Sequence, residues 1–315
     1  MKRFHTIDEN NKEQFDFDWL KEAVEEKSLI TVNGVSGGKT SAYIASNYPA
    51  DHTVFSLVRT TDKNCMFPDA KVRQMVSDRI GTEFVGTLEF DEIIYTILDL
   101  EQFIGKKIDW VTGKTFDEVV LRKNGKHGKC LPDVFRRFCT QEMKIKPLGQ
   151  WAYDNLNEVH EWRLGFRANE TRRAENTNKR LKNGCLWDKF IVGKHKNGNN
   201  KWTKEIPYQI PVYPLIENNI YKDQIEAYWK GKPVRFAYMN NCVGCFHRPP
   251  ALLNHISHKA PNKFKWFSDQ EIPEHNILWK SEKGVTYDSI GKLFKQMSIF
   301  DDDEFNECDS GYCGL

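Results

Sequence analysis

The sequence lacks any apolar stretch long enough to span a lipid bilayer, and its first residues lack the apolar region of a secretion signal. It also lacks an excess of either charge, because 29% of its 315 residues are charged and yet the formal net charge is only +2. These absences argue against a membrane partner and against a global field that would attract nucleic acid. We therefore expect a globular, cytoplasmic protein, in which a local basic patch can still exist.

Cysteine occurs eight times, and a cytosolic compartment keeps thiols reduced. Metal binding or redox chemistry is therefore expected ahead of structural disulfides. Cys242 and Cys245 form a C-x-x-C pair, Cys139 follows two arginines, and Cys308 and Cys313 lie at the end of the sequence.

The pattern of apolar runs predicts an α/β fold. After a helical pattern at 15–27, short β-rich runs at 29–33, 53–58 and 83–85 alternate with helical patterns at 40–46 and 69–79, and 161–166 supplies a further strand. Such alternation is typical of βαβ units, so we expect a doubly wound parallel sheet with helices on both faces. We expect three parts: a helical lead-in at 1–28, a nucleotide-binding domain at 29–235 with an insert at 179–205, and a smaller cysteine-containing region at 236–315 with a mobile tail.

The sequence Ser-Gly-Gly-Lys-Thr-Ser at 36–41 follows the first expected strand and precedes a helix. A glycine turn at a helix start presents backbone N–H groups and a positive helix end to a phosphate. Its spacing is not that of a Walker A loop. The predicted nucleotide-binding residues of this turn are Ser36, Gly37, Gly38, Lys39, Thr40 and Ser41. The alternative is an ordinary glycine turn capped by Thr40 or Ser41.

The hexapeptide resembles the PP-loop of the adenine nucleotide alpha-hydrolase superfamily, with Thr40 where the usual Ser-Gly-Gly-x-Asp-Ser form has Asp. Four further segments resemble, in order, those of the phosphoadenosine phosphosulfate reductase family: 59–69, 136–148, 164–173, and 213–215 with 223–229. The resemblance implies an adenine nucleotide alpha-hydrolase-like fold. The missing Asp favours sulfonucleotide chemistry over that of the ATP pyrophosphatases.

A sulfonucleotide carries several anionic oxygens, which arginine binds in a planar, bidentate way. Within the resembling segments, Thr61 lies where the family approaches the nucleotide, and the chosen anion-binding cations are Arg137, Lys144, Arg167 and Arg173. The alternative for each cation is a solvated surface charge.

Cys242 and Cys245 can reach one metal centre, and Cys139 is the preferred third ligand because cluster-containing relatives place cysteine in both segments. The resemblance thus implies a [4Fe–4S] cluster, whose fourth ligand could be Cys130 or a C-terminal cysteine. Zinc held by the same three cysteines and His247 is the competing interpretation, and buried unligated thiols are the simplest one.

The ending Tyr-Cys-Gly-Leu at 312–315 resembles the reductase tail whose cysteine is the nucleophile. Cys313 is therefore the predicted catalytic residue, with Cys308 as a second thiol that could form a resolving disulfide or share a metal. The alternative is a frayed tail without a function.

Three functions follow from these motifs. The first is reduction of phosphoadenylyl or adenylyl sulfate to sulfite, with thioredoxin or glutaredoxin as the thiol partner. The second is ATP-dependent, Fe–S-assisted sulfur insertion into tRNA or DNA, which the basic insert at 179–205 favours. The third is a zinc-stapled nucleotide-binding module without enzyme activity. A homodimer is a further assembly that we consider.

Overall fold

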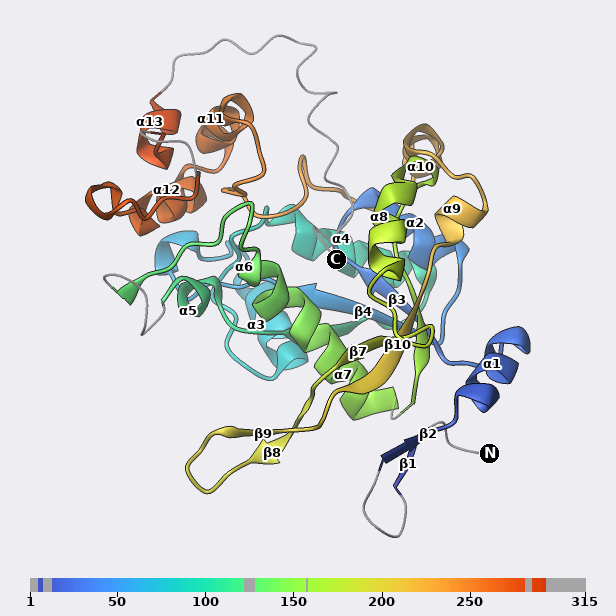
Figure 1. Ribbon diagram of the computed structural model, residues 1–315. Helices are drawn as coiled ribbons and strands as arrows, with labels where there is room; N and C mark the ends of the chain where they lie inside the picture. Colours follow the sequence, from blue (N-terminus) through green and yellow to red (C-terminus); the bar gives the residue numbers. More distant parts are fainter. Residues whose placement is uncertain (1–4, 8–12, 122–127, 157, 281–284, 293–315) are drawn as a thin grey trace.

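The computed structural model describes residues 5–7, 13–121, 128–156, 158–280 and 285–292, drawn in colour in Figure 1. Its largest sheet has six strands in the order β5 (Asp109–Thr112), β4 (His52–Leu57), β3 (Thr31–Val35), β6 (His160–Arg163), β10 (Ile206–Val212) and β7 (Leu186–Asp188). The first five run parallel to one another, and β7 runs antiparallel to β10 at the edge. The carboxyl ends of the parallel strands therefore meet at one edge of the sheet, where ligands bind in open α/β sheets.

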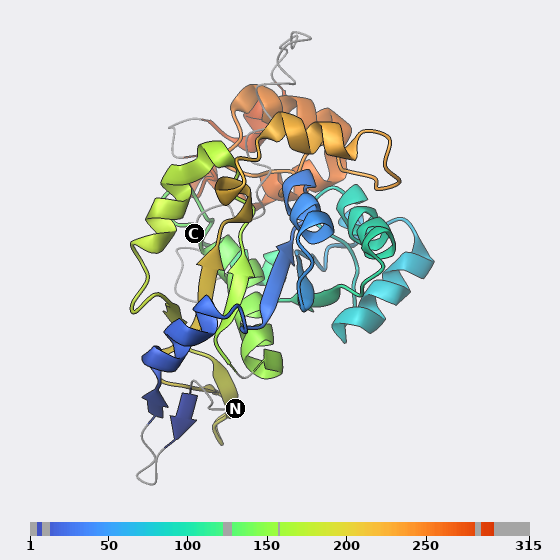
Figure 2. The ribbon, with the colours of Figure 1, turned by 90° about the vertical axis from the view of Figure 1, so that its right-hand side faces the viewer.

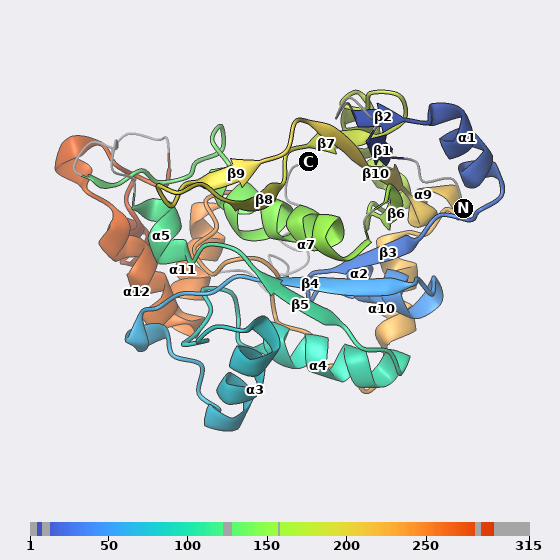
Figure 3. The ribbon, with the colours of Figure 1, turned by 90° about the horizontal axis from the view of Figure 1, so that it is seen from below.

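Alternate residues of the central strands pack against helices on opposite faces. On one face, Val54 of β4 clusters with Leu148 and Ala152 of α7 (Lys146–Leu156). On the other face, Phe55 clusters with residues of α2 (Lys39–Asn47), α3 (Ala70–Ile80), α4 (Glu92–Ile104) and α10 (Lys222–Trp229). Figure 3 shows α7 on one side of β4 and β5 and the helices α3 and α4 on the other. The predicted α/β fold with a mostly parallel sheet is confirmed.

The predicted helices begin and end close to where the sequence placed them. The segments 15–27, 40–46 and 69–79 contain or overlap α1 (Phe17–Glu25), α2 and α3. The Asp69 carboxylate caps α3 by accepting the N–H groups of Lys71 and Val72 at 2.8 and 3.1 Å. Gly81 ends this helix with a φ of 66°, a conformation that favours glycine.

The predicted strand at 83–85 is wrong. These residues are irregular, and Gly86 beside them makes isolated bridges to Thr60 and Met66. A Cβ atom at Gly86 would lie 1.9 Å from the Cys65 carbonyl oxygen, so the two chain segments meet at a distance that only glycine permits. The strand next to β4 is instead β5, which the apolar pattern did not identify.

Two small hairpins stand beside the main sheet: β1 (His5–Ile7) with β2 (Glu13–Phe15), and β8 (Ile191–Lys194) with β9 (Asn200–Trp202). The remaining elements of the α/β part are α5 (Phe116–Val120), α6 (Phe138–Thr140), α8 (Thr171–Asn178), α9 (Pro214–Glu217), the 3₁₀ turns Lys63–Cys65 and Ala168–Glu170, and a π-helical segment, Gln141–Ile145. In the described part of the chain, no helix is long and apolar enough to cross a membrane.

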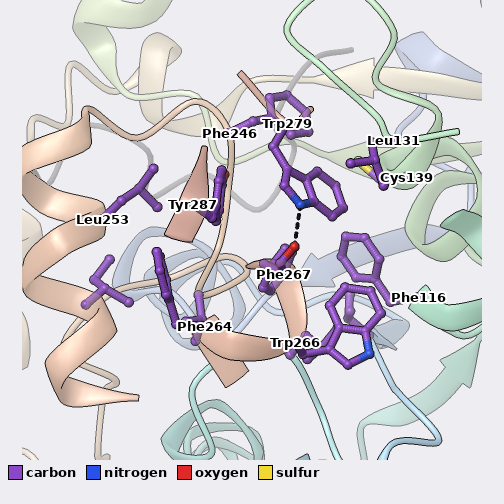
Figure 4. Close-up of a cluster of buried hydrophobic side chains, with 14 of the residues drawn as sticks. Phe116, Leu131, Cys139, Phe246, Leu253, Phe264, Trp266, Phe267, Trp279 and Tyr287 are labelled. Carbon is purple, nitrogen blue, oxygen red and sulfur yellow. Dashed lines mark hydrogen bonds between the residues drawn. The ribbon is translucent and has the colours of Figure 1, made fainter. Parts of the chain in front are cut away.

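The C-terminal helices α11 (Pro250–Lys259), α12 (Pro261–Gln270) and α13 (Tyr287–Gly291), with the 3₁₀ turn Pro273–His275, pack around an aromatic core. Figures 1 and 2 both place these helices at the end of the molecule opposite the β1–β2 hairpin. Figure 4 shows the core, in which the Trp279 indole N–H donates to the Phe267 carbonyl at 2.8 Å. Phe116 of α5 meets the Trp266 and Phe267 rings edge-on, with ring centroids 5.3 and 5.4 Å apart. This contact joins the C-terminal helices, which we call the C-terminal lobe, to the α/β part. The same core contains Cys139.

Glu271, just after α12, ties this lobe together. Its carboxylate accepts the backbone N–H of Trp279 at 3.1 Å and the backbone N–H of Tyr287 at 2.7 Å. Burial raises its pKa from the ordinary 4.5 to about 7, although these two hydrogen bonds act to lower it. Between these values the folded protein holds a proton that the unfolded chain releases, so the contribution of Glu271 to stability falls as the pH rises.

We predict that Glu271→Gln removes this pH dependence. The free energy of unfolding of the wild type should fall relative to that of the variant between about pH 4.5 and 7, because only the wild type must ionise a buried carboxyl group. Chemical denaturation at a series of pH values measures the difference. Glu274→Gln, at an exposed position, is the control and should parallel the wild type. Parallel curves for Glu271→Gln and the wild type would contradict the prediction.

Candidate functional site

The turn between β3 and α2 has the geometry of an anion-binding helix start. Helix α2 begins at Lys39, and its N-cap is Gly38, which has no side chain to cap the first-turn N–H groups. Gly37 has a φ of +80°, and a Cβ atom there would lie 2.6 Å from Ile93 Cγ2. Backbone conformation and space therefore both require glycine at this position.

The hydroxyl of Ser41 holds this turn in shape. It donates to the Gly38 carbonyl at 3.1 Å and accepts the backbone N–H of Ser36, also at 3.1 Å. The two serine hydroxyl oxygens lie 3.1 Å apart, and since the Ser41 proton is already used, Ser36 is the donor of that pair. The turn is thus fixed by its own side chains before any ligand arrives.

A small pocket opens at this turn. Ser36 and Ser41 contribute its polar wall, and Ser56 of β4 and Gly165, which follows β6, add the neighbouring strand ends. The pocket therefore lies at the carboxyl edge of the sheet, where the α/β topology predicts a ligand. We call it the turn pocket.

A second small pocket lies against the aromatic core of the C-terminal lobe. Its lining includes all three predicted metal ligands, Cys139, Cys242 and Cys245. We call it the thiol pocket. Thr140 and Lys144 line both pockets, so the two spaces adjoin at these residues.

The π-helical segment places Cys139 and Lys144 at this junction. It connects α6, which carries Cys139, to α7, and Lys144 lies within it. Such insertions in helices occur frequently at functional sites. The Lys144 ammonium pairs at 2.9 Å with Glu89, whose side chain is only 2% exposed. Sequence reasoning missed Glu89, because nothing in its local sequence marks it as the partner of a lysine 55 positions away.

The C-x-x-C turn is held from three sides. The Cys245 N–H donates to the Cys242 carbonyl at 3.1 Å, and the Val243 N–H donates to the Leu88 carbonyl at 2.8 Å. The Tyr287 hydroxyl donates to the Gly244 carbonyl at 2.9 Å. A Cβ atom on Gly244 would lie 2.3–2.7 Å from atoms of the Phe267 ring, so the turn packs directly on the aromatic core.

Burial keeps two of the pocket thiols protonated. It raises the pKa of Cys139 to about 11, and the neighbouring Cys245 adds to the rise. Burial also raises the pKa of Cys242 well above its ordinary value, with further contributions from Glu89, Cys245 and Cys139 that Lys144 opposes. The three sulfurs are therefore close enough to influence one another electrostatically.

The donor set of the thiol pocket suits zinc or an iron–sulfur cluster, but its arrangement does not by itself form a metal site. Among the described residues, no group of three or more His, Cys, Asp and Glu side chains is placed so that it could hold a metal ion. Arg137 and His247 line the thiol pocket beside the cysteines, whereas Cys130 does not. The metal prediction stays a prediction.

Several predicted binding residues are engaged elsewhere. Lys39 pairs with Glu226 of α10, and Thr61 is exposed and donates its backbone N–H to Asp117 at 2.8 Å. Arg167 and Arg173 both pair with Glu170. None of these four side chains belongs to the described lining of the two pockets. Thr40 is buried at the base of the turn, where a Cβ atom at Gly165 would lie 3.4 Å from its methyl group.

The predicted catalytic residues Cys308 and Cys313 lie outside the described residues. A comparison with protein-family models found no matching family, and a comparison with curated proteins found no match.

We predict that Gly244→Ala destabilises the C-terminal lobe, because its methyl group would overlap the Phe267 ring. The expected loss is about 1–3 kcal/mol of unfolding free energy, the usual cost of overpacking a core. Gly291→Ala is the matched control, since its Cβ atom would lie 3.5 Å from Phe264, an ordinary contact. Urea denaturation measures both variants, and equal stabilities for them would contradict the packing described here.

Proposed function

We propose that this protein binds an adenine nucleotide in the turn pocket and performs sulfur chemistry in the adjoining thiol pocket, as an enzyme resembling the phosphoadenosine phosphosulfate reductases. The favoured reaction is the reduction of phosphoadenylyl or adenylyl sulfate to sulfite. The observation that carries the proposal is the junction of the two pockets at Thr140 and Lys144.

The turn pocket supports the nucleotide half of the proposal. Free N–H groups at the start of α2 and the positive end of its dipole favour a phosphate, and the N-cap Gly38 has no side chain that would compete for them. Ser36 and Ser41 add hydroxyl groups along the same wall. Because Lys39 pairs with Glu226, phosphate binding here would depend on the backbone more than on that lysine.

Lys144 and Arg137 support the sulfur half. Both line the thiol pocket, and Lys144 also lines the turn pocket. A sulfate attached to a bound nucleotide would therefore meet Arg137 and the Lys144 ammonium, which Glu89 already pairs, as it extends between the two. Cations in a site with aromatic walls stabilise developing negative charge more strongly than they would in water.

The attacking thiol in this mechanism is Cys313. Its thiolate attacks the sulfur of the phosphosulfate, the sulfur–oxygen bond to the phosphate breaks, and the nucleoside phosphate leaves with the electron pair. A dithiol of thioredoxin or glutaredoxin then releases sulfite from the cysteine S-sulfonate and is itself oxidised to a disulfide. The raised pKa values of Cys139 and Cys242 make these two cysteines poor nucleophiles, which supports an attacking thiol other than either of them.

A second candidate is ATP-dependent sulfur insertion into tRNA or DNA. The observation that favours it is the convergence of Cys139, Cys242 and Cys245 on one pocket beside the nucleotide turn. In either reaction, these cysteines are the residues that would hold a [4Fe–4S] cluster or zinc, and metal analysis after anaerobic purification tests that part separately. The colourless zinc form would also fit the non-enzymatic nucleotide-binding module.

We predict that Gly37→Ala abolishes nucleotide binding, because its methyl group would strain the turn and overlap Ile93. Gly105→Ala is the matched control: Gly105 also has a positive φ, of +61°, but a Cβ atom there meets no atom within 4 Å. Both variants lose about 1 kcal/mol or more from backbone strain, and only Gly37→Ala should lose affinity for adenine nucleotides in calorimetric titration. Wild-type affinity in Gly37→Ala would contradict the assignment of the turn pocket.

We predict that Cys313→Ser stops sulfite formation and the transfer of labelled sulfur from phosphoadenylyl or adenylyl sulfate to the protein. Serine cannot form the S-sulfonate, whereas Cys65→Ser, which keeps a donor for the Asn262 carbonyl, should retain both activities. Sulfite release by Cys313→Ser at the wild-type rate would contradict the mechanism. Conversion of ATP to AMP that tRNA or DNA stimulates, without sulfite, would favour the second candidate.

A further inference from the structure

The β8–β9 hairpin is a strongly basic arm on a protein of nearly neutral net charge. Five exposed lysines and one histidine lie between positions 189 and 204, with no acidic residue among them: Lys189, Lys194, His195, Lys196, Lys201 and Lys204. Every residue from 192 to 202 is exposed. None of the five lysines forms an ion pair with a described residue, so their charge is open to a partner.

The base of this arm is firmly attached to the body. Gln150 of α7 donates to the Ile191 carbonyl at 3.0 Å and accepts the Ile191 N–H at 2.8 Å. The Phe190 ring stacks on Tyr153 at 4.9 Å with an interplanar angle of 10°. The arm thus leaves the molecule in a defined direction, and Figure 1 shows it extending beyond the rest of the ribbon.

The tip is also ordered. The His195 N–H donates to the Asn199 carbonyl at 2.8 Å, and the Gly198 N–H donates to the His195 carbonyl at 2.9 Å. In the strand register, Lys194 lies opposite Asn200 and Ile191 opposite Trp202. Because side chains alternate along a strand, Lys194 and Trp202 share one face of the ribbon and Lys201 lies on the other.

We propose that the β8–β9 hairpin is a binding arm for double-stranded DNA. A two-stranded ribbon fits the major groove of B-form DNA, whose width is about 12 Å, and lysines on both of its faces would reach the phosphates on either side. Asparagine side chains near the tip can donate and accept hydrogen bonds at base edges and sugars. The A-form groove of duplex RNA is too narrow for such an insertion.

The composition of the arm favours DNA over the other anionic partners. A membrane-surface element needs a broad apolar face, whereas the exposed large apolar side chains of this arm are Val192 and Trp202 alone. The arm also leaves the sheet at the end opposite the turn pocket, because Asp188 of the antiparallel β7 pairs with Ile206, at the start of β10. It therefore anchors a partner away from the nucleotide chemistry, and DNA binding should not need a nucleotide.

The test is binding of a labelled DNA duplex to the full-length protein, without nucleotide, followed by fluorescence anisotropy at several salt concentrations. Five phosphate contacts would give a slope of log affinity against log salt of about −4.5. The variant Lys194→Ala/Lys196→Ala/Lys201→Ala should lose about 2.7 of that slope and at least about tenfold in affinity at 50 mM salt. Trp202→Ala should weaken binding while leaving the slope unchanged.

In the matched control variant, three other exposed lysines are replaced by alanine: Lys21, Lys107 and Lys265. This variant should bind the duplex as the wild type does. Gly37→Ala should also bind normally, which separates this inference from the proposed nucleotide chemistry, although the second candidate function would use such an arm. Equal losses in the hairpin and control variants would overturn the proposal. Equal or tighter binding of the same arm to duplex RNA or to anionic phospholipid vesicles would overturn it as well.

Discussion

The ion pair between Lys144 and Glu89 connects the parts on which the site depends. Lys144 comes from the π-helical segment before α7 and faces both pockets, while Glu89 lies in the irregular segment 86–91. Removing one partner of such a buried pair leaves an uncompensated charge, at a typical cost of about 3–5 kcal/mol. The position of the cation between the pockets is therefore fixed by a buried carboxylate.

The segment 86–91 extends this connection to the C-terminal lobe. The Leu88 carbonyl accepts the Val243 N–H of the C-x-x-C turn, and the Glu89 carbonyl accepts the ammonium of the buried Lys263 of α12 at 2.7 Å. Lys263 also pairs with Asp91. Burial raises the pKa of Asp91 above its ordinary value, although Lys263 acts to lower it. One stretch of irregular chain thus sets the distance between the sheet, the thiol pocket and the helices behind it.

The sequence predicted the parts of the structure that depend on local patterns. The glycines of the β3–α2 turn and the alternation of strands and helices act over a few residues. Arg167 and Arg173 each lie three residues from Glu170, with which both form ion pairs. This spacing is a local pattern, although both arginines were interpreted as anion ligands. In contrast, the pairs Lys144–Glu89 and Lys39–Glu226 join residues 55 and 187 positions apart, and no local pattern specifies them.

The walls of the thiol pocket strengthen contacts between cations and anions but disfavour the ionised form of the thiols. Aromatic packing around Cys139, with Phe116, Phe267 and Trp279 in the same core, lowers the local dielectric and strengthens any contact between Lys144 and an anion. The same environment disfavours a thiolate, so Cys139 and Cys242 hold their protons unless something replaces them. A metal would do so by displacing the protons, whereas an attacking thiolate would have to come from a cysteine other than these two.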